Sequence, residues 1–259
     1  MLKKLLKHDF ISVWRLALPI FAIATGIVLF AYTMCMINSD NPVLEIFSIL
    51  LLPTGIIVLI VACVVIFCLP VIHFYRNLMT GEGYLSFTLP VTTYQIVLSK
   101  LIVGAVTMLF NLVFTVGGFL LLLSTEADLG TFSLKGLHMP DGASIVPFIV
   151  AMVITIVFAT ICQQIYLYLA VCLGQVLCKN KIIGSVLGYA IIYVVNQVIN
   201  LALLVIMVLC IGFDNLDTFM VTTKHLVLFF SVLASEYVIL GSISYVLSGR
   251  ILKNRLNLN

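Results

Sequence analysis

Charged side chains are scarce in this chain, and their scarcity excludes a soluble globular protein. Asp, Glu, Lys and Arg make up 9% of the 259 residues, whereas hydrophobic residues make up 63%. The mean hydropathy is +1.27. A soluble domain usually carries about 25% charged residues. Most of the chain is therefore expected to lie in the lipid bilayer, and a formal net charge of +3 is too small to indicate a nucleic-acid partner.

The sequence also lacks the motifs of catalysis, metal binding and nucleotide binding. Its seven cysteines stand singly with no C-x-x-C pair, which indicates neither a disulfide framework nor a metal cluster. There is no G-x4-G-K-[ST] P-loop, no H-E-x-x-H and no G-x-S-x-G. We therefore predict that the chain is not an enzyme and that it holds no catalytic residue, no metal and no cofactor of its own.

Long apolar blocks predict an all-α integral membrane protein with six transmembrane helices. A helix needs about 20 apolar residues to cross the hydrocarbon core, and every block reaches that length. The predicted spans are residues 16–37, 46–72, 97–123, 145–173, 182–210 and 226–248. The loops are too short for a core of their own, so residues 1–259 are predicted to form one transmembrane domain. An inverted repeat of three plus three spans occurs in many transporters, but the two halves share no convincing residue similarity.

The distribution of basic residues predicts the orientation. Only Lys135 and Lys224 fall on one side of the predicted spans, so 11 of the 13 basic residues (13 − 2) fall on the other side. Lys and Arg are retained in cytoplasmic loops. Both termini are therefore predicted to be cytoplasmic.

The first fifteen residues predict an amphipathic interfacial helix before the first span. Apolar residues recur there at helical spacing, and basic residues fall mainly between them. Two roles stay open for this helix. One is a simple topology anchor, and the other is an elbow that braces the first span and touches a cytoplasmic partner.

The cytoplasmic loop of residues 73–96 is unusual because its centre is aromatic and almost uncharged. Gly81 and Gly83 flank its one acid, Glu82, and favour a turn or a helix start. Pro90 restricts the preceding residue to extended geometry, and Thr92 or Thr93 can cap the third span. The residues alone leave two interpretations open. One is a short helix that docks into a soluble protein, and the other is a turn whose aromatic rings sit at headgroup level.

A family resemblance favours the docking helix. The order Tyr75-Arg76-Asn77-Leu78, followed by Glu-Gly-Tyr-Leu-Ser-Phe-Thr-Leu-Pro-Val at residues 82–91, resembles the loop between spans two and three of bacterial ABC-2 type permeases. The leader ending in Trp14-Arg15 and the six-span layout with both ends inside are similar as well. The resemblance implies that the loop is a coupling helix that contacts a separate ATP-binding subunit. The implied contact residues are Arg76, Glu82, Gly83, Tyr84, Leu85, Phe87 and Leu89.

The same resemblance implies an exporter in the bacterial cytoplasmic (inner) membrane. The permease would pair with a second copy of itself or with a sister permease. Two ABC ATPase subunits would bind Mg-ATP in trans. The alternative is a secondary transporter or a non-transporting membrane module, neither of which requires a soluble ATPase.

Polar residues inside the spans are candidates for a pathway or for interhelical hydrogen bonding. In the fifth span the polar positions recur four, three and four residues apart, which places them within about 60° of one another on a helix. Those residues are Tyr189, Tyr193, Asn196 and Asn200, and the fourth span carries a similar stripe that includes Gln164 and Tyr168. Glu236 is the one acid inside the sixth span, where an unpaired carboxylate is costly. Gly184-x-x-x-Gly188 predicts close packing of the fifth span against a neighbour.

Overall fold

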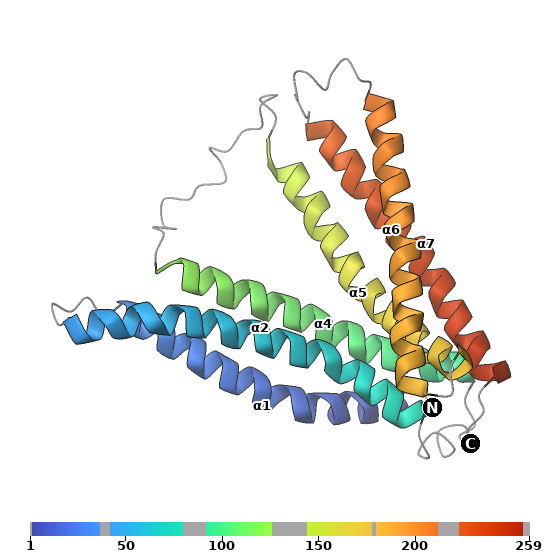
Figure 1. Ribbon diagram of the computed structural model, residues 1–259, viewed down its shortest axis with the longest axis horizontal. Coiled ribbons are helices and arrows are strands. Elements are labelled where there is room, and N and C mark those ends of the chain that lie inside the picture. The colour runs from blue at the N-terminus through green and yellow to red at the C-terminus, as the bar shows by residue number, and fades with distance from the viewer. Residues whose placement is uncertain are drawn as a thin grey trace. The chain divides into compact units, whose positions relative to one another are not determined.

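The structure is a computed structural model that describes residues 2–36, 42–79, 92–125, 144–177, 180–211 and 223–255. These residues form long helices and, among them, no β-strand (Figure 1). The helices are α1 (Leu2–Met36), α2 (Pro42–Met79), α4 (Thr93–Leu123), α5 (Val146–Leu177), α6 (Lys181–Ile211) and α7 (Thr223–Arg255).

In the described part of the chain, six helices are long and apolar enough to cross a membrane, which confirms the predicted all-helical class and indicates a multi-pass membrane protein. The helices are longer than the predicted spans. At 1.5 Å per residue, the 38 residues of α2 extend about 57 Å, whereas the hydrocarbon core is about 30 Å thick. The helices therefore tilt in the bilayer or continue past its hydrocarbon layer.

Several helix ends differ from the predicted boundaries, and α7 continues to Arg255 instead of ending at residue 248. Helix α1 runs without a break from Leu2 to Met36, so the predicted interfacial helix is its first part. Helix α2 continues to Met79, so the first residues of the predicted loop are helical. Thr92 is the N-cap of α4, as predicted, and its backbone N–H donates to Gln95 Oε1 at 3.3 Å.

The chain divides into two compact units, Met1–Phe132 and Ser133–Asn259. In the first unit α1, α2 and α4 pack against one another in all three pairings. Its core is apolar along the helix axes, with Ala31 and Leu59 in one cluster and Ala17, Phe21 and Ile66 in another. Phe21 also meets the rings of two phenylalanines of α4, Phe110 and Phe114, edge to face. Ring pairs of this kind stabilise packing beyond their buried area.

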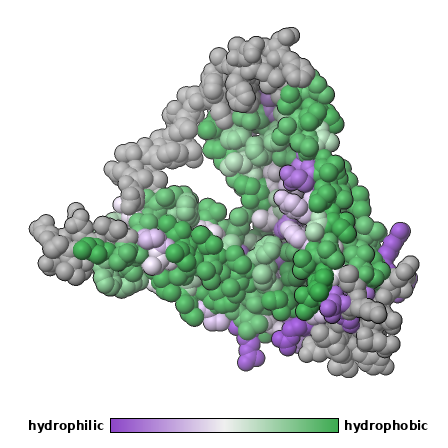
Figure 2. Space-filling model, viewed as in Figure 1, coloured by the Kyte–Doolittle hydropathy of each residue, from purple (hydrophilic) through white to green (hydrophobic). Residues whose placement is uncertain are grey.

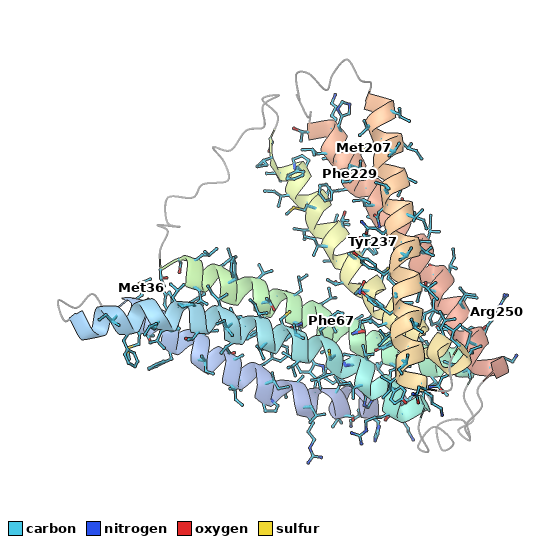
Figure 3. The ribbon with its side chains drawn as sticks, viewed as in Figure 1. Met36, Phe67, Met207, Phe229, Tyr237 and Arg250 are labelled. Atoms are coloured by element: carbon cyan, nitrogen blue, oxygen red, sulfur yellow. The ribbon has the colours of Figure 1, made fainter. Side chains whose placement is uncertain are left out.

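In the second unit α5 is the central helix. It packs against both α6 and α7, whereas α6 and α7 make little contact with each other. Thr155 Oγ1 donates to the Phe230 carbonyl at 2.8 Å, and Cys162 Sγ donates to the Tyr237 carbonyl at 3.0 Å, so polar contacts join α5 to α7. Tyr237 is labelled on α7 in Figure 3. The visible surface of the described helices is mostly hydrophobic, as expected for helices that face lipid (Figure 2).

Candidate functional site

The predicted coupling loop lies mostly outside the described residues. Glu82, Gly83, Tyr84, Leu85, Phe87 and Leu89 all fall in the stretch 80–91, which the structure does not describe. Arg76 is described, and its side chain is exposed in the last turn of α2. The structure does describe the end of α2, which precedes this stretch, and the start of α4, which follows it.

A polar cluster with a buried centre joins these two helix ends to the start of α1. We call it the root cluster, and it consists of Asp9, Ser12, His73, Asn77, Ser99 and Lys100. Asp9 Oδ1 accepts from Lys100 Nζ at 3.1 Å, and Asp9 Oδ2 accepts from Ser99 Oγ at 2.5 Å. His73 Nε2 lies 3.4 Å from Asp9 Oδ1. One carboxylate of α1 is thus held by side chains of both α2 and α4.

The ion pair at the centre of the root cluster is almost completely removed from solvent. Asp9 is 2% exposed and Lys100 is 4% exposed. Burying two charges costs several kcal/mol per ion, and the cost is repaid only when close geometry and further hydrogen bonds satisfy them. The contact from Ser99 supplies such a bond. The pair therefore fixes α1 to α4 in one relative position.

His73 connects the carboxylate to two more side chains. Its Nδ1 lies 3.5 Å from Ser12 Oγ, and its Nε2 lies 3.1 Å from Asn77 Nδ2 as well as facing Asp9. One ring nitrogen cannot both donate to Asp9 and accept from the Asn77 amide. The tautomer of His73 therefore decides which of the two contacts is a hydrogen bond.

The arrangement can transmit a displacement. A force applied to the stretch 80–91 acts on the last turns of α2 and the first turns of α4. Since Asp9 is bonded to Ser99 and Lys100 of α4 and faces His73 of α2, a shift of those turns would act on α1 through this carboxylate. Packed helices respond to force by rigid-body shifts rather than by continuous deformation.

None of the six residues of the root cluster was predicted from the sequence to be a site residue. The available signal was one acid within an otherwise basic leader of fifteen residues.

The polar stripes of the second unit are only partly brought together. Tyr189 OH accepts from Gln163 Nε2 of α5 at 2.7 Å, and Asn200 Nδ2 donates to the Asn196 carbonyl of its own helix at 2.9 Å. Tyr193 is 57% exposed. The stripe on α6 therefore contacts α5 through Tyr189, while Tyr193 faces outward from this unit.

The stripe on α5 is buried. Gln164 is fully buried, and neither its Nε2 nor its Oε1 has a hydrogen-bond partner among the described residues. Tyr168 is 1% exposed. A buried amide without partners costs about 1–3 kcal/mol. Interhelical hydrogen bonding within this unit thus accounts for Tyr189 but leaves Gln164 unexplained.

Glu236 is the buried acid of α7. It is 7% exposed, and its Oε2 has no hydrogen-bond partner in the described part of the chain. The hydroxyl of Tyr166, on α5, is likewise buried and unpartnered. Gln164, Gln175, Tyr166 and Glu236 are thus the residues of the second unit with a buried polar side-chain atom that lacks a hydrogen-bond partner in the described part of the chain.

The predicted close packing at Gly184 and Gly188 is confirmed. A Cβ atom at Gly184 would lie 2.5 Å from the Gly174 carbonyl oxygen, and one at Gly188 would lie 3.0 Å from the Ala170 carbonyl oxygen, both on α5. The backbones of α5 and α6 therefore touch directly.

Gly184→Ala is accordingly expected to lower the free energy of unfolding by about 1–3 kcal/mol, because the new methyl group meets backbone that cannot turn aside. Thermal unfolding in detergent measures the effect. Gly26→Ala on α1 is the matched control, since a Cβ there has nothing within 4 Å. Equal melting temperatures for the two variants would contradict the direct backbone contact.

Comparison of the chain with protein-family models, with curated proteins and with solved structures gives no match. The described residues hold no group of three or more His, Cys, Asp or Glu side chains that could bind a metal ion.

Proposed function

We propose that this chain is the transmembrane permease subunit of an ATP-driven ABC exporter. Six helices of membrane-spanning length among the described residues support a transport role, and the resemblance of residues 75–91 to an ABC-2 permease loop supports the exporter class. The observation that carries the proposal is the root cluster. It braces both ends of the loop against α1, as a loop that receives force from an ATPase requires.

In this proposal the loop contacts a separate nucleotide-binding subunit that binds Mg-ATP. Both termini are cytoplasmic in the bacterial inner membrane. Closure of two ATPase subunits pushes on the loop, and the root cluster passes the movement to α1. A second permease copy or a sister permease completes the transporter.

Reconstitution tests the proposal. The chain alone in lipid nanodiscs is expected to hydrolyse no ATP, and addition of its soluble partner is expected to give turnover that requires both proteins. Transport by the chain alone, driven by an ion gradient, would contradict the proposal.

A specific observation favours one other function, a secondary transporter. Oε2 of Glu236 and both amide atoms of Gln164 are buried and have no hydrogen-bond partner among the described residues. Ionisable groups inside membrane helices often mark proton or substrate pathways. In the exporter, Glu236, Gln164, Tyr168, Tyr189, Tyr193, Asn196 and Asn200 would line the pathway or join helices.

Glu236→Gln separates a pathway role from a packing role, because glutamine keeps the shape of the side chain but cannot exchange a proton. If Glu236 acts in the pathway, the variant is expected to change the pH dependence of ATP-driven turnover in nanodiscs. A pH profile identical to that of the unchanged protein would show that Glu236 only packs helices. Ser235→Ala is the matched control, because Ser235 is the exposed neighbour of Glu236 on the same helix.

A further inference from the structure

A cavity of about 240 Å³ opens between α1 and α2 beside the root cluster. Its polar lining consists of His8 and Ser12 from α1 and of His73, Arg76 and Asn77 from α2. Every one of these side chains can donate a hydrogen bond. Among the described residues no Asp or Glu lines the cavity. Asp9 lies behind the lining residue His73, and its charge is paired with Lys100. Such a lining favours an anion.

The remaining walls are apolar. They are formed by Val13 and Leu16 of α1 and by Leu69 and Ile72 of α2. Leu16 is 57% exposed and Ile72 is 51% exposed, so the apolar wall continues onto the outer surface of these helices. A ligand that fits both parts carries an anionic group next to hydrocarbon.

The position of the cavity matches a membrane interface. Lys3, Lys4 and Lys7 are exposed at the same end of α1, and the long apolar run begins just beyond Arg15. Trp14, the single tryptophan of the chain, follows the cavity residue Val13, and tryptophan is enriched at headgroup level. A basic segment in front of a span attracts anionic lipid.

We propose that this cavity binds the phosphate of an anionic phospholipid, with His8 and Arg76 as its main contacts and the acyl chains along Leu16 and Ile72. The volume supports a headgroup rather than a whole transported molecule, because pockets for drug-sized ligands measure about 300–1,000 Å³. Arginine matches phosphate because its planar guanidinium donates two parallel hydrogen bonds. The site does not depend on the ATPase, so its test is independent of the exporter proposal.

The fluorescence of Trp14 provides a direct titration, since no other tryptophan contributes. The purified full chain in a neutral detergent is titrated with dioctanoyl phosphatidic acid, with dioctanoylglycerol, which lacks the phosphate, and with inorganic phosphate. Phosphatidic acid is expected to saturate the signal, with one molecule retained per chain in native mass spectrometry. Dioctanoylglycerol is expected to bind at least about tenfold more weakly, since losing a charge-assisted contact of about 1.4 kcal/mol lowers affinity tenfold.

The double variant His8→Gln with Arg76→Gln is expected to weaken phosphatidic acid binding at least about tenfold. Lys4→Gln with Lys7→Gln is the matched control, because both lysines are exposed at the same end of α1 and do not line the cavity. The control is expected to retain binding within about threefold. Arg76→Lys keeps the positive charge but not the planar guanidinium that donates two parallel hydrogen bonds. This variant is expected to bind phosphatidic acid with intermediate affinity.

Three results would overturn the lipid site. Equal losses in the double variant and its control would show general attraction to basic residues. Equal binding of dioctanoylglycerol would show that no phosphate is recognised. Inorganic phosphate binding as tightly as phosphatidic acid would assign the cavity to free phosphate instead. If thermal unfolding shows that the double variant is not folded, His8→Gln alone is compared with the lysine control, because His8 is exposed.

Discussion

Asp9→Ala is expected to lower the free energy of unfolding by about 3–5 kcal/mol, which is the usual cost of removing one partner of a buried ion pair. The alanine leaves Lys100 charged in a site that is 4% exposed, and it leaves Ser99 without its acceptor. Reversible unfolding of the purified chain in mixed detergent micelles measures the loss. Because the buried lysine loses its acid in Asp9→Ala, Asp9→Ala combined with Lys100→Met is expected to recover a large part of the lost free energy.

Lys3→Ala is the matched control for this experiment. Lys3 lies on the same helix and is exposed, so its loss is expected to change the unfolding free energy by less than about 0.5 kcal/mol. Two findings would contradict the stabilising role of the root cluster. One is an Asp9→Ala effect as small as that of the control, and the other is additive effects of the Asp9 and Lys100 substitutions, since contacting residues give non-additive ones.

Glu82→Ala combined with Tyr84→Ala is expected to weaken the binding of the ATPase subunit by about 100-fold or more. The reason is that buried tyrosines and paired charges at the centre of an interface each cost about 2 kcal/mol or more when truncated. Titration of the purified ATPase onto the chain in nanodiscs measures the affinity. The thermal stability of the isolated variant establishes that the permease is still folded.

Arg250→Ala combined with Lys253→Ala serves as the control for this docking experiment. Both side chains are exposed near the end of α7 and fall on the same predicted side of the membrane as the loop. This control is expected to keep the affinity within about threefold, as truncations outside an interface centre do. If both double variants weaken binding equally, the ATPase recognises only the general charge on this side of the membrane. That result would contradict a docking role for residues 82–89.

Much of the helical architecture could be predicted from local sequence. Long runs without charge predict spans because an apolar helix is the stable state of such a segment in lipid. Thr92 or Thr93 was expected to cap the third span, and Thr92 is the N-cap of α4. The spacing of Gly184 and Gly188 correctly indicated a close helix contact. The helix ends were less predictable, because residues such as His73 and Arg76 are polar enough to leave the hydrocarbon layer yet still continue the helix.

The root cluster could not be predicted, because its central contact joins residues 91 positions apart. The packing faces in the second unit were hidden for a related reason. A membrane helix is apolar on all sides, so the hydrophobic pattern does not distinguish the side that faces protein from the side that faces lipid. For that reason the sequence showed that Tyr189 and Tyr193 share one face of a helix. It did not show that Tyr189 contacts α5 while Tyr193 is exposed.

We infer above all that a separate ATPase drives this chain through the loop of residues 80–91. Affinity purification of the tagged chain from its native membrane, followed by mass spectrometry of the proteins that accompany it, tests this claim most directly. The account predicts a stoichiometric P-loop ATPase that is lost when Glu82 and Tyr84 are both replaced by alanine. A clean preparation without an ATPase and without Mg-ATP hydrolysis would contradict it, and would favour a secondary transporter in which the loop is only an interfacial turn.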